Sequence, residues 1–515
     1  MTEVSVKENA ILADGLSRRS FLKASGAAAA VTAGMMLIGC SPKGNENLGP
    51  IPSEWNDEAD VVIIGGGGAG FSAAMAATEA GSTVIVLEKG TMTGGSTALC
   101  GQAIMGVGTS VQKALGIEDS VDKAMEYFKA VGDAREDLTQ FVLEHSGEAV
   151  DWLIGLGMKV PEEAGCPGLA YGGQELEYAD VAEPIMRTHW SVKPDPGLWP
   201  VLQKAVEASE DINVLTETPA IALVQDPVTN EIIGVITDNE GHKAIKAHKA
   251  VILAAGGYAR NPQMMKSLIS QYEIQTSAND GDEGDGLNLG ISAGAGIGYF
   301  GMLTDVQYTN PAKPCVYVII GPDNMEDKPS FIAVNINGER FTDERKFYSY
   351  VGQDILKQPE GRGYIVTCGE NGLKGLGAAG EESMKGETLE ELAKQIGIDP
   401  TTLVGAVEQW NKNCAAGSDP QCGRTTELYP LENGPYYAAE IKAGCASTFG
   451  GVDIDTEMHV IGAIDKKPIP RLYAAGMNTL AVGRFYPTCG TAVAGAITTG
   501  LQAGRSAAAE TAIEE

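Results

Sequence analysis

Closely spaced cysteines and positive charge are both scarce in this sequence of 515 residues. No two of its nine cysteines are separated by only two residues, which excludes CxxC zinc sites, CxxCH haem attachment and ferredoxin-type cluster motifs. Lysine and arginine number 37 against 68 aspartates and glutamates, which gives a net charge of −31. Because phosphate binding needs a cationic surface that releases counterions, nucleic acid is excluded as a partner.

Glycine is what the sequence has in excess. Sixty-six residues are glycine, about 13% of the chain and nearly twice the usual share of about 7%, and they stand in short clusters. Such clusters indicate tight turns where the backbone comes close to a ligand, commonly a phosphate. With 43% hydrophobic residues the chain can bury a large core, and its length predicts two or three domains.

The N-terminus reads as an export signal. Residues 17–23 spell Ser-Arg-Arg-Ser-Phe-Leu-Lys ahead of a weakly apolar stretch, the twin-arginine pattern of a pathway that moves folded proteins. A buried helix is the alternative, and the strict heptamer argues against it. The stretch ends Leu-Ile-Gly-Cys, which resembles a lipobox and would make Cys40 a lipidated first residue. We predict a signal peptide at 1–39, a tether at 40–57, and a protein of the cell envelope, lipid-anchored to the outer face of the cytoplasmic membrane or periplasmic.

Residues 60–88 have the pattern of a βαβ unit. An apolar strand leads into Gly-x-Gly-x-x-Gly, and a small-residue helix and a second strand follow. Its glycines permit a tight turn, close backbone approach to a pyrophosphate and close helix packing, while the acidic residue that ends the second strand accepts from ribose hydroxyls. The unit predicts dinucleotide binding by Gly65, Gly67, Gly70 and Glu88.

Other glycine clusters punctuate the predicted elements that follow. Strands at 250–255 and 472–475 run into glycine, a helix is expected at 198–210 and a hairpin at 222–236. The remaining residues predicted to bind the cofactor are Gly95, Ser96, Gly256, Gly257, Asp285, Gly476 and Asn478.

The stretch from 302 to 437 has a different pattern, with strands expected at 316–320 and 331–336 and a helix at 389–396. We interpret it as an insertion into the nucleotide-binding domain, to which the chain then returns. The predicted domains are therefore residues 58–301 with 438–515, and residues 302–437.

Taken in order, these motifs resemble the FAD-dependent family that contains the fumarate reductase and succinate dehydrogenase flavoproteins, the 3-ketosteroid dehydrogenases, and the urocanate and acrylate reductases. The resemblance covers about residues 58–512. It implies an α/β fold in which an inserted α+β capping (catalytic) domain closes over FAD held by a Rossmann-like domain. Members with covalent flavin carry a histidine in the segment matching 94–97, which has none here, so the resemblance implies non-covalent FAD.

Members that act on fumarate hold the dicarboxylate with arginines and histidines, and this chain departs from their pattern at three places. Tyr348, after the run at 338–344, stands where they carry the catalytic arginine. Alanine and serine replace two histidines at 446–447, and Pro487 replaces a further arginine. These departures make fumarate a poor candidate substrate.

The same positions match the 3-ketosteroid dehydrogenases better. Those enzymes carry a tyrosine at the position of Tyr348 and a Tyr-Pro-Gly-x-Gly motif, which residues 486–490 match except at the third position. The resemblance implies that the Tyr486 hydroxyl and the Gly490 N–H hold a ketone, while flavin N5 exchanges a hydride and Tyr348 a proton with the neighbouring carbons.

We therefore expect an oxidoreductase acting on CH–CH groups, which reduces, or reversibly dehydrogenates, a C=C conjugated to the carbonyl of a 3-ketosteroid-like or other bulky enone. The alternative is a reductase of unsaturated carboxylates of the fumarate, urocanate or cinnamate type, with Arg345 or Arg484 holding the anion. A third alternative is a non-enzymatic lipoprotein that binds a small molecule, against which the intact glycines argue. A further family tyrosine corresponds to Tyr171 or Tyr178.

The electron source is expected to lie outside this chain, because the sequence contains no haem or cluster motif. An exported flavoprotein without a relay of its own implies a docking partner, a membrane-bound cytochrome or quinol oxidase. Such a donor favours the reductive direction and a role in anaerobic respiration.

Overall fold

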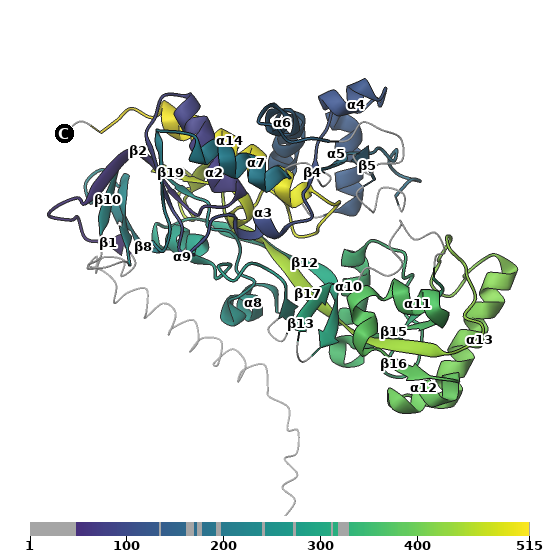
Figure 1. Cartoon of the computed structure of the whole chain (residues 1–515). Coiled ribbons are helices and arrows are strands. Elements are labelled where there is room, and N and C mark those ends of the chain that lie inside the picture. The colour runs from purple at the N-terminus through teal and green to yellow at the C-terminus, as the bar shows by residue number, and fades with distance from the viewer. Residues whose placement is uncertain are drawn as a thin grey trace, which may run out of the picture. The chain divides into compact units, whose positions relative to one another are not determined.

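A computed structural model describes most of the chain (Figure 1). The described residues are 48–132, 135–160, 169–171, 178–191, 197–238, 243–270, 274–310, 313–317 and 329–513. Residues Gly49–Glu515 form one compact unit, and the contacts below lie within it. The predicted signal peptide, Cys40 and the first part of the tether fall outside the described residues. Within the described part, no helix has the length and apolar character needed to cross a membrane.

The larger sheet is built on five parallel strands in the order β19-β10-β2-β3-β7. Its strands are β2 (Asp57–Ile64), β3 (Val84–Leu87), β7 (Ile212–Leu215), β10 (Ala244–Leu253) and β19 (Pro468–Ala474). Val61, Val62 and Ile63 are completely buried, as expected of a parallel sheet that is covered on both faces and therefore has continuous apolar strands. The structure confirms the strands predicted around residues 60–64, 83–87, 250–255 and 472–475.

An antiparallel hairpin extends one edge of this sheet. Strand β8 (Ala220–Gln225) pairs with β9 (Ile232–Thr237), and β9 pairs with the first half of β10, so the hairpin predicted at 222–236 is confirmed. The predicted helix at 198–210 is also present as α7 (Leu198–Glu207). It ends three residues early because the chain turns there to enter β7.

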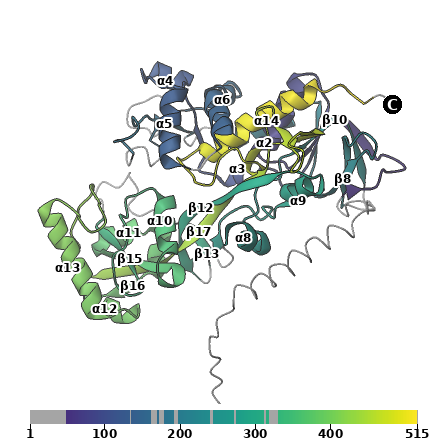
Figure 2. The same cartoon turned by 180° about the vertical axis from the view of Figure 1, so that it is seen from behind.

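Helices α2 (Gly68–Glu79) and α14 (Thr491–Ala509) lie side by side next to the larger sheet (Figures 1 and 2). Their backbones are very close, because a Cβ atom on Gly500 or Gly504 would collide with the carbonyl oxygens of Ala69 or Ala73. Small residues thus bring together the two helices whose N-termini follow the predicted cofactor loop and the predicted ketone-binding motif.

A second sheet occupies the stretch predicted as the insertion, in the order β13-β12-β17-β15-β14. Its two longest strands, β12 (Ile297–Asn310) and β17 (Tyr436–Val452), are antiparallel and run side by side towards the larger sheet (Figure 1). There Val452 forms a β-bridge with Thr479. The predicted limits at 302 and 437 fall inside these two strands, so the domain boundaries stay a prediction.

Elements expected in the insertion appear close to their predicted places. Strand β14 (Phe331–Asn335) and helix α12 (Leu389–Gln395) each end one residue earlier than predicted. Strand β13 (Lys313–Tyr317) covers the start of the strand expected at 316–320, and residues 318–320 lie outside the described part.

A buried ion cluster stabilises the second sheet. The guanidinium groups of Arg340 and Arg424 lie 4.5 and 4.9 Å from the ring centre of Trp410. Glu344 pairs with both arginines, at 2.8 and 3.2 Å, and Asp419 pairs with Arg340 at 2.7 Å. Removing one partner would leave a buried charge unpaired, which is strongly destabilising. The run 338–344 is thereby fixed just ahead of helix α10 (Tyr348–Leu356).

The remaining strands are β1 (Leu48–Gly49), β4 (Ala103–Met105), β5 (Leu169–Ala170), β6 (Thr188–Trp190), β11 (Gln275–Thr276), β15 (Arg362–Cys368), β16 (Met384–Gly386) and β18 (His459–Ile461). The remaining α-helices are α3 (Gly95–Leu99), α4 (Ser110–Ala114), α5 (Val121–Val131), α6 (Glu136–Gly155), α8 (Pro262–Ile269), α9 (Asp285–Ser292), α11 (Gly369–Gly375) and α13 (Pro400–Ala416). The described residues also include the short 3₁₀ helices Pro359–Gly361, Gly377–Glu382 and Gly476–Asn478.

Candidate functional site

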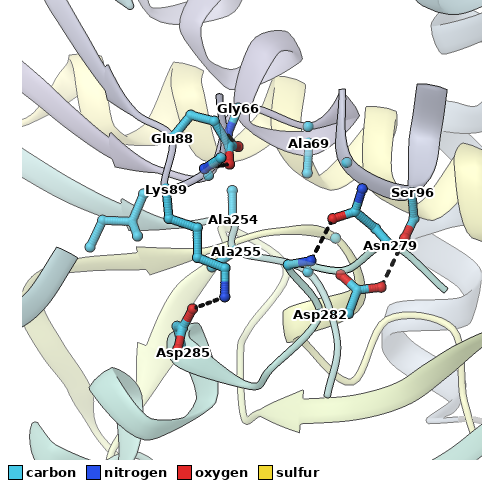
Figure 3. Close-up of a pocket in the computed structure, with 18 of the residues that line it drawn as sticks. Gly66, Ala69, Glu88, Lys89, Ser96, Ala254, Ala255, Asn279, Asp282 and Asp285 are labelled. Carbon is cyan, nitrogen blue, oxygen red and sulfur yellow. Dashed lines mark hydrogen bonds and ion pairs between the residues drawn. The ribbon is translucent and has the colours of Figure 1, made fainter. Parts of the chain in front are cut away.

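A cavity of about 500 Å³ opens where strands β2, β3 and β10 end (Figure 3). The carboxyl edge of a parallel sheet is the usual place for a ligand in such folds, because loops and helix N-termini converge there. Nine of the eleven residues predicted to bind the cofactor line this cavity: Gly65, Gly67, Glu88, Gly95, Ser96, Gly256, Gly257, Asp285 and Gly476.

Gly67 leaves room in the cavity in front of a helix N-terminus. It is the N-cap of α2 and makes no side-chain cap. A Cβ atom on Gly67 would have a single neighbour within 4 Å, the Gly94 carbonyl oxygen at 3.7 Å. The open space therefore faces backbone N–H groups that favour an anion. These residues fit the pyrophosphate of FAD.

The Gly67→Ala variant is expected to fold normally and to purify with little FAD, because its methyl group would fill the space that the pyrophosphate needs. The ratio of flavin absorbance to protein, measured beside the circular dichroism spectrum, checks this. Gly155→Ala is the matched control, since a Cβ there meets nothing within 4 Å. Full flavin occupancy in Gly67→Ala would show that this loop does not hold the cofactor.

Gly70 and Asn478, the other two predicted residues, do not line the cavity. A Cβ on Gly70 would collide with the carbonyl oxygen of Gly65, so this glycine allows the helix to pack against the turn. Asn478 is 2% exposed, and its amide nitrogen lies 3.5 Å from the carbonyl oxygen of Leu253. A direct contact between Asn478 and the cofactor stays a prediction.

Glu88 is held in place at the end of β3. Its Oε2 accepts a hydrogen bond from the Gly66 N–H at 3.0 Å and its Oε1 accepts one from the Gly90 N–H at 2.7 Å (Figure 3). Each carboxylate oxygen has a second lone pair. The side chain is thus oriented by the backbone and can still accept from ribose hydroxyls at the cavity wall.

Polar contacts made by Lys89 and by Ser96 link segments on opposite sides of the cavity (Figure 3). Lys89 pairs with Asp285 at 2.6 Å and with Glu283 at 2.8 Å. The Ser96 hydroxyl donates to Asp282 at 2.8 Å, and burial raises the pKa of that aspartate. Lys89 and Asp282 were not predicted from the sequence. The local signal for Lys89 was its place next to Glu88, and for Asp282 it was the acidic run that ends at Asp285.

A separate cluster of aromatic side chains contains both tyrosines predicted to be catalytic. Tyr486 is 7% exposed and stacks with Phe347 and Phe449, with ring centres 6.1 and 5.9 Å apart. Tyr348, the first residue of α10, packs on Phe347 with ring centres 4.2 Å apart. The cluster brings together Phe347, which precedes α10, Phe449 of β17 and Tyr486, which precedes α14.

Tyr486 and Gly490 are in direct contact. The Gly490 N–H donates a hydrogen bond to the Tyr486 hydroxyl oxygen at 2.8 Å, and Gly490 is the N-cap of α14 with φ +87°. Burial raises the pKa of Tyr486 well above its ordinary value, so its hydroxyl is neutral. The sequence predicts that the Tyr486 hydroxyl and the Gly490 N–H both donate to one ketone oxygen. In this structure the Gly490 N–H donates to the Tyr486 hydroxyl oxygen instead and so polarises the phenol.

Of the two tyrosines left open by the sequence, Tyr178 lies near α10. Its hydroxyl is 2.7 Å from that of Tyr350, and its ring contacts Tyr127 edge to face at 6.0 Å. The Tyr127 hydroxyl in turn donates to the carbonyl oxygen of Pro487. Tyr171 is 41% exposed. Tyr127 and Tyr350 were missed because nothing local separates them from packing tyrosines.

The two arginines considered for an anionic substrate are placed differently from each other. The Arg345 guanidinium pairs with Glu427 at 2.9 Å. Arg484 is exposed and lies 5.7 Å from the ring centre of Tyr299. An anionic substrate would have to compete with Glu427 for the first of them.

Comparison with known proteins places this arrangement in a wider group. Residues 60–493 match the family described as FAD binding domain, and residues 15–34 match the signal sequence of the twin-arginine translocation pathway. A urocanate reductase of Eggerthella lenta is 32% identical over 450 residues, which are 82% of this chain and 70% of that protein. A digoxin reductase of the same species is 29% identical over 561 residues, 96% of this chain and 97% of that protein.

A solved structure with the same fold is the 3-ketosteroid Δ4-(5α)-dehydrogenase of Rhodococcus jostii RHA1 in complex with 4-androstene-3,17-dione. It superposes with a TM-score of 0.73 at 26% identity and covers 89% of this chain and 99% of that one.

Proposed function

From its membership of the FAD-binding-domain family, as an exported FAD-dependent oxidoreductase acting on CH–CH groups, we propose a substrate class for this chain. It reduces a C=C that is conjugated to the carbonyl of a bulky enone of 3-ketosteroid type. The same site could run the reverse dehydrogenation. The observation that carries the proposal is the buried pair of Tyr486 and Gly490 inside an aromatic cluster.

The chemistry of this pair suits a neutral carbonyl. A ketone oxygen gains negative charge as its conjugated C=C is reduced, and fixed donors in a dry site stabilise that charge. The Tyr486 hydroxyl is such a donor, and the N-terminus of α14 adds its positive end. A dicarboxylate would instead need arginine forks, and the Arg345 guanidinium is already paired with Glu427.

Tyr348 is proposed as the proton donor. FAD, when bound, supplies the hydride. An ordinary phenol has a pKa of about 10 and is protonated at neutral pH, so Tyr348 is ready to give a proton to the α-carbon in the reductive direction. Phe347 packs on both the Tyr348 ring and the Tyr486 ring, and this shared contact supports the proposal that the two tyrosines act at one site.

The relatives support both candidate substrate classes. The digoxin reductase is named for a steroid-type substrate, and the ketosteroid dehydrogenase structure was solved with the steroid 4-androstene-3,17-dione, which is an enone. The urocanate reductase supports the alternative, a reductase of unsaturated carboxylates of the fumarate, urocanate or cinnamate type. We favour the enone because the pair of Tyr486 and Gly490 suits a neutral carbonyl.

The decisive experiment compares substrates with reduced enzyme under anaerobic conditions, following flavin reoxidation. A steroid enone should reoxidise the flavin far faster than fumarate or urocanate. Arg345→Ala should leave the enone rate unchanged, because Arg345 has no role in holding a neutral carbonyl. Faster reoxidation by an unsaturated acid, together with its loss in Arg345→Ala, would replace the enone proposal by the alternative.

The twin-arginine signal indicates export across the cytoplasmic membrane, and we propose that Cys40 then carries a lipid. The electron donor would be a membrane-bound cytochrome or quinol oxidase, reached from the outer face of that membrane. Cys40→Ala is expected to release the exported protein from the membrane fraction, as measured by pelleting and salt washing. A variant that still pellets and resists salt would argue against the lipid.

A further inference from the structure

Three polar residues lie on one face of the second sheet, around Gly444. Asp305 of β12 is paired with Gly444 on one side, and Gln275 of β11 is paired with Gly444 on the other. Side chains of directly paired residues share a face, as do residues two apart on a strand, so Gln307 joins them. A Cβ atom on Gly444 would collide with the Asp305 carboxylate and the Gln307 amide. The glycine thus makes room above it for the side chains of Asp305 and Gln307, and Gln275 is paired with it on the other side.

Each of the three side chains presents a buried oxygen that has no hydrogen-bond partner: Asp305 Oδ1, Gln307 Oε1 and Gln275 Oε1. Asp305 is 1% exposed and Gln307 is completely buried. The Gln307 amide nitrogen donates to Asp305 Oδ2 at 3.2 Å, and the Ser277 hydroxyl donates to the same oxygen at 3.1 Å. Rotating the Gln307 amide by 180° would place its Oε1 against Asp305 Oδ2, and two acceptors would then face each other. Gln307 Oε1 therefore points away from Asp305 Oδ2 and has no hydrogen-bond donor.

The carboxylate of Asp305 also lacks a counterion within the described part of the chain. Burial raises its pKa to about 6, and the groups that oppose that shift are neutral donors: the Gln307 amide, the Ser277 hydroxyl and the backbone N–H of Asp305. The group is therefore mostly ionised at neutral pH. A buried charge that is not neutralised is costly, and so is each buried acceptor that has no donor.

We propose that Asp305, Gln307 and Gln275 bind a monovalent alkali cation, sodium or potassium, through these three oxygens. Carboxylate and amide oxygens are the ligands that hard cations prefer. The set carries one negative charge, so a monovalent ion makes the buried group neutral, whereas a divalent ion would leave a positive charge buried. This assignment is independent of the enone proposal.

The position of the site suggests a stabilising role. It connects β11, β12 and β17, and the two long strands run from here towards the larger sheet. Helix α10 packs on the same stretch, because a Cβ atom on Gly352 would meet the Asp305 carbonyl oxygen at 2.8 Å. A bound cation would hold these strands together below the helix that begins with Tyr348.

The test measures the unfolding temperature of the FAD-loaded protein in sodium, potassium or choline chloride at equal ionic strength. One alkali salt should raise it by about 1–3 °C for each tenfold increase above its Kd, and choline should not. Asp305→Asn should abolish the difference, while Glu79→Gln, which removes an exposed carboxylate, should retain it. Equal unfolding temperatures in all three salts, as an ordered water or a protonated Asp305 would give, overturn the proposal.

A second variant keeps the proposal testable if Asp305→Asn does not fold. Gln307→Glu raises the charge of the ligand set to two, and it should shift the stabilising response from alkali cations to calcium. Where potassium is the stabilising ion, crystals of the wild type grown with rubidium chloride, which replaces potassium, should show an anomalous peak between Asp305 and Gln307. A wild-type crystal without that peak, or a Gln307→Glu variant that responds to no cation, would contradict the assignment.

Discussion

Replacing Tyr348 by phenylalanine is expected to lower turnover with a steroid enone by about 10²–10⁴, the range typical for loss of a general acid. The variant removes one oxygen and keeps the ring that packs on Phe347, so FAD content and the unfolding temperature should stay at the wild-type level. Anaerobic stopped-flow measurement of flavin reoxidation separates this chemical step from flavin binding.

Tyr429→Phe is the matched control, because it makes the same change at a 42% exposed tyrosine outside the aromatic cluster. The pH dependence gives a second test of the role. In the dehydrogenase direction the phenol must act as a base, so that rate should rise with pH, whereas the reductive direction needs the protonated phenol and its rate should fall when the phenol loses its proton. If Tyr348→Phe retains full activity, Tyr348 is not the acid.

Replacing Tyr486 by phenylalanine is expected to cost about 10²–10³ in the rate of enone reduction, as loss of one oxyanion donor does in other enzymes. The change also leaves the Gly490 N–H without the oxygen to which it donates at 2.8 Å. An unpaired buried donor costs about 1–3 kcal/mol, so the substrate-free protein should be less stable. A bound ketone can accept from that N–H, so saturating substrate should restore part of the stability.

Tyr473→Phe is the control for this second variant. Tyr473 is 1% exposed and its hydroxyl donates to Glu510 at 2.8 Å, so the variant also removes a buried hydroxyl with a partner, away from the aromatic cluster. It should lose stability without the loss of rate. A Tyr486→Phe enzyme that loses stability and keeps its rate would show that the hydroxyl is only structural.

The cofactor half of the molecule was largely predictable, because its signals are local. The motif around Gly65 and Gly67, the apolar strands and Glu88 each lie within about 30 residues, and a βαβ unit of that length has few ways to pack. The cavity forms where the strand ends predict it. The export signal is equally local, since it is a short linear pattern that can be recognised without the rest of the fold.

The sequence by itself thus determined the fold class, the cofactor and the export route, while the tertiary structure decided which side chains meet. Strand register alone brings Gln275 and Asp305 together across Gly444. Packing between distant segments places Phe347 beside Tyr486 and gives Arg345 the partner Glu427. Periodicity and motifs report short-range preferences of the backbone, but a buried pair is chosen by the packing and charge balance of the whole core, which no local pattern contains.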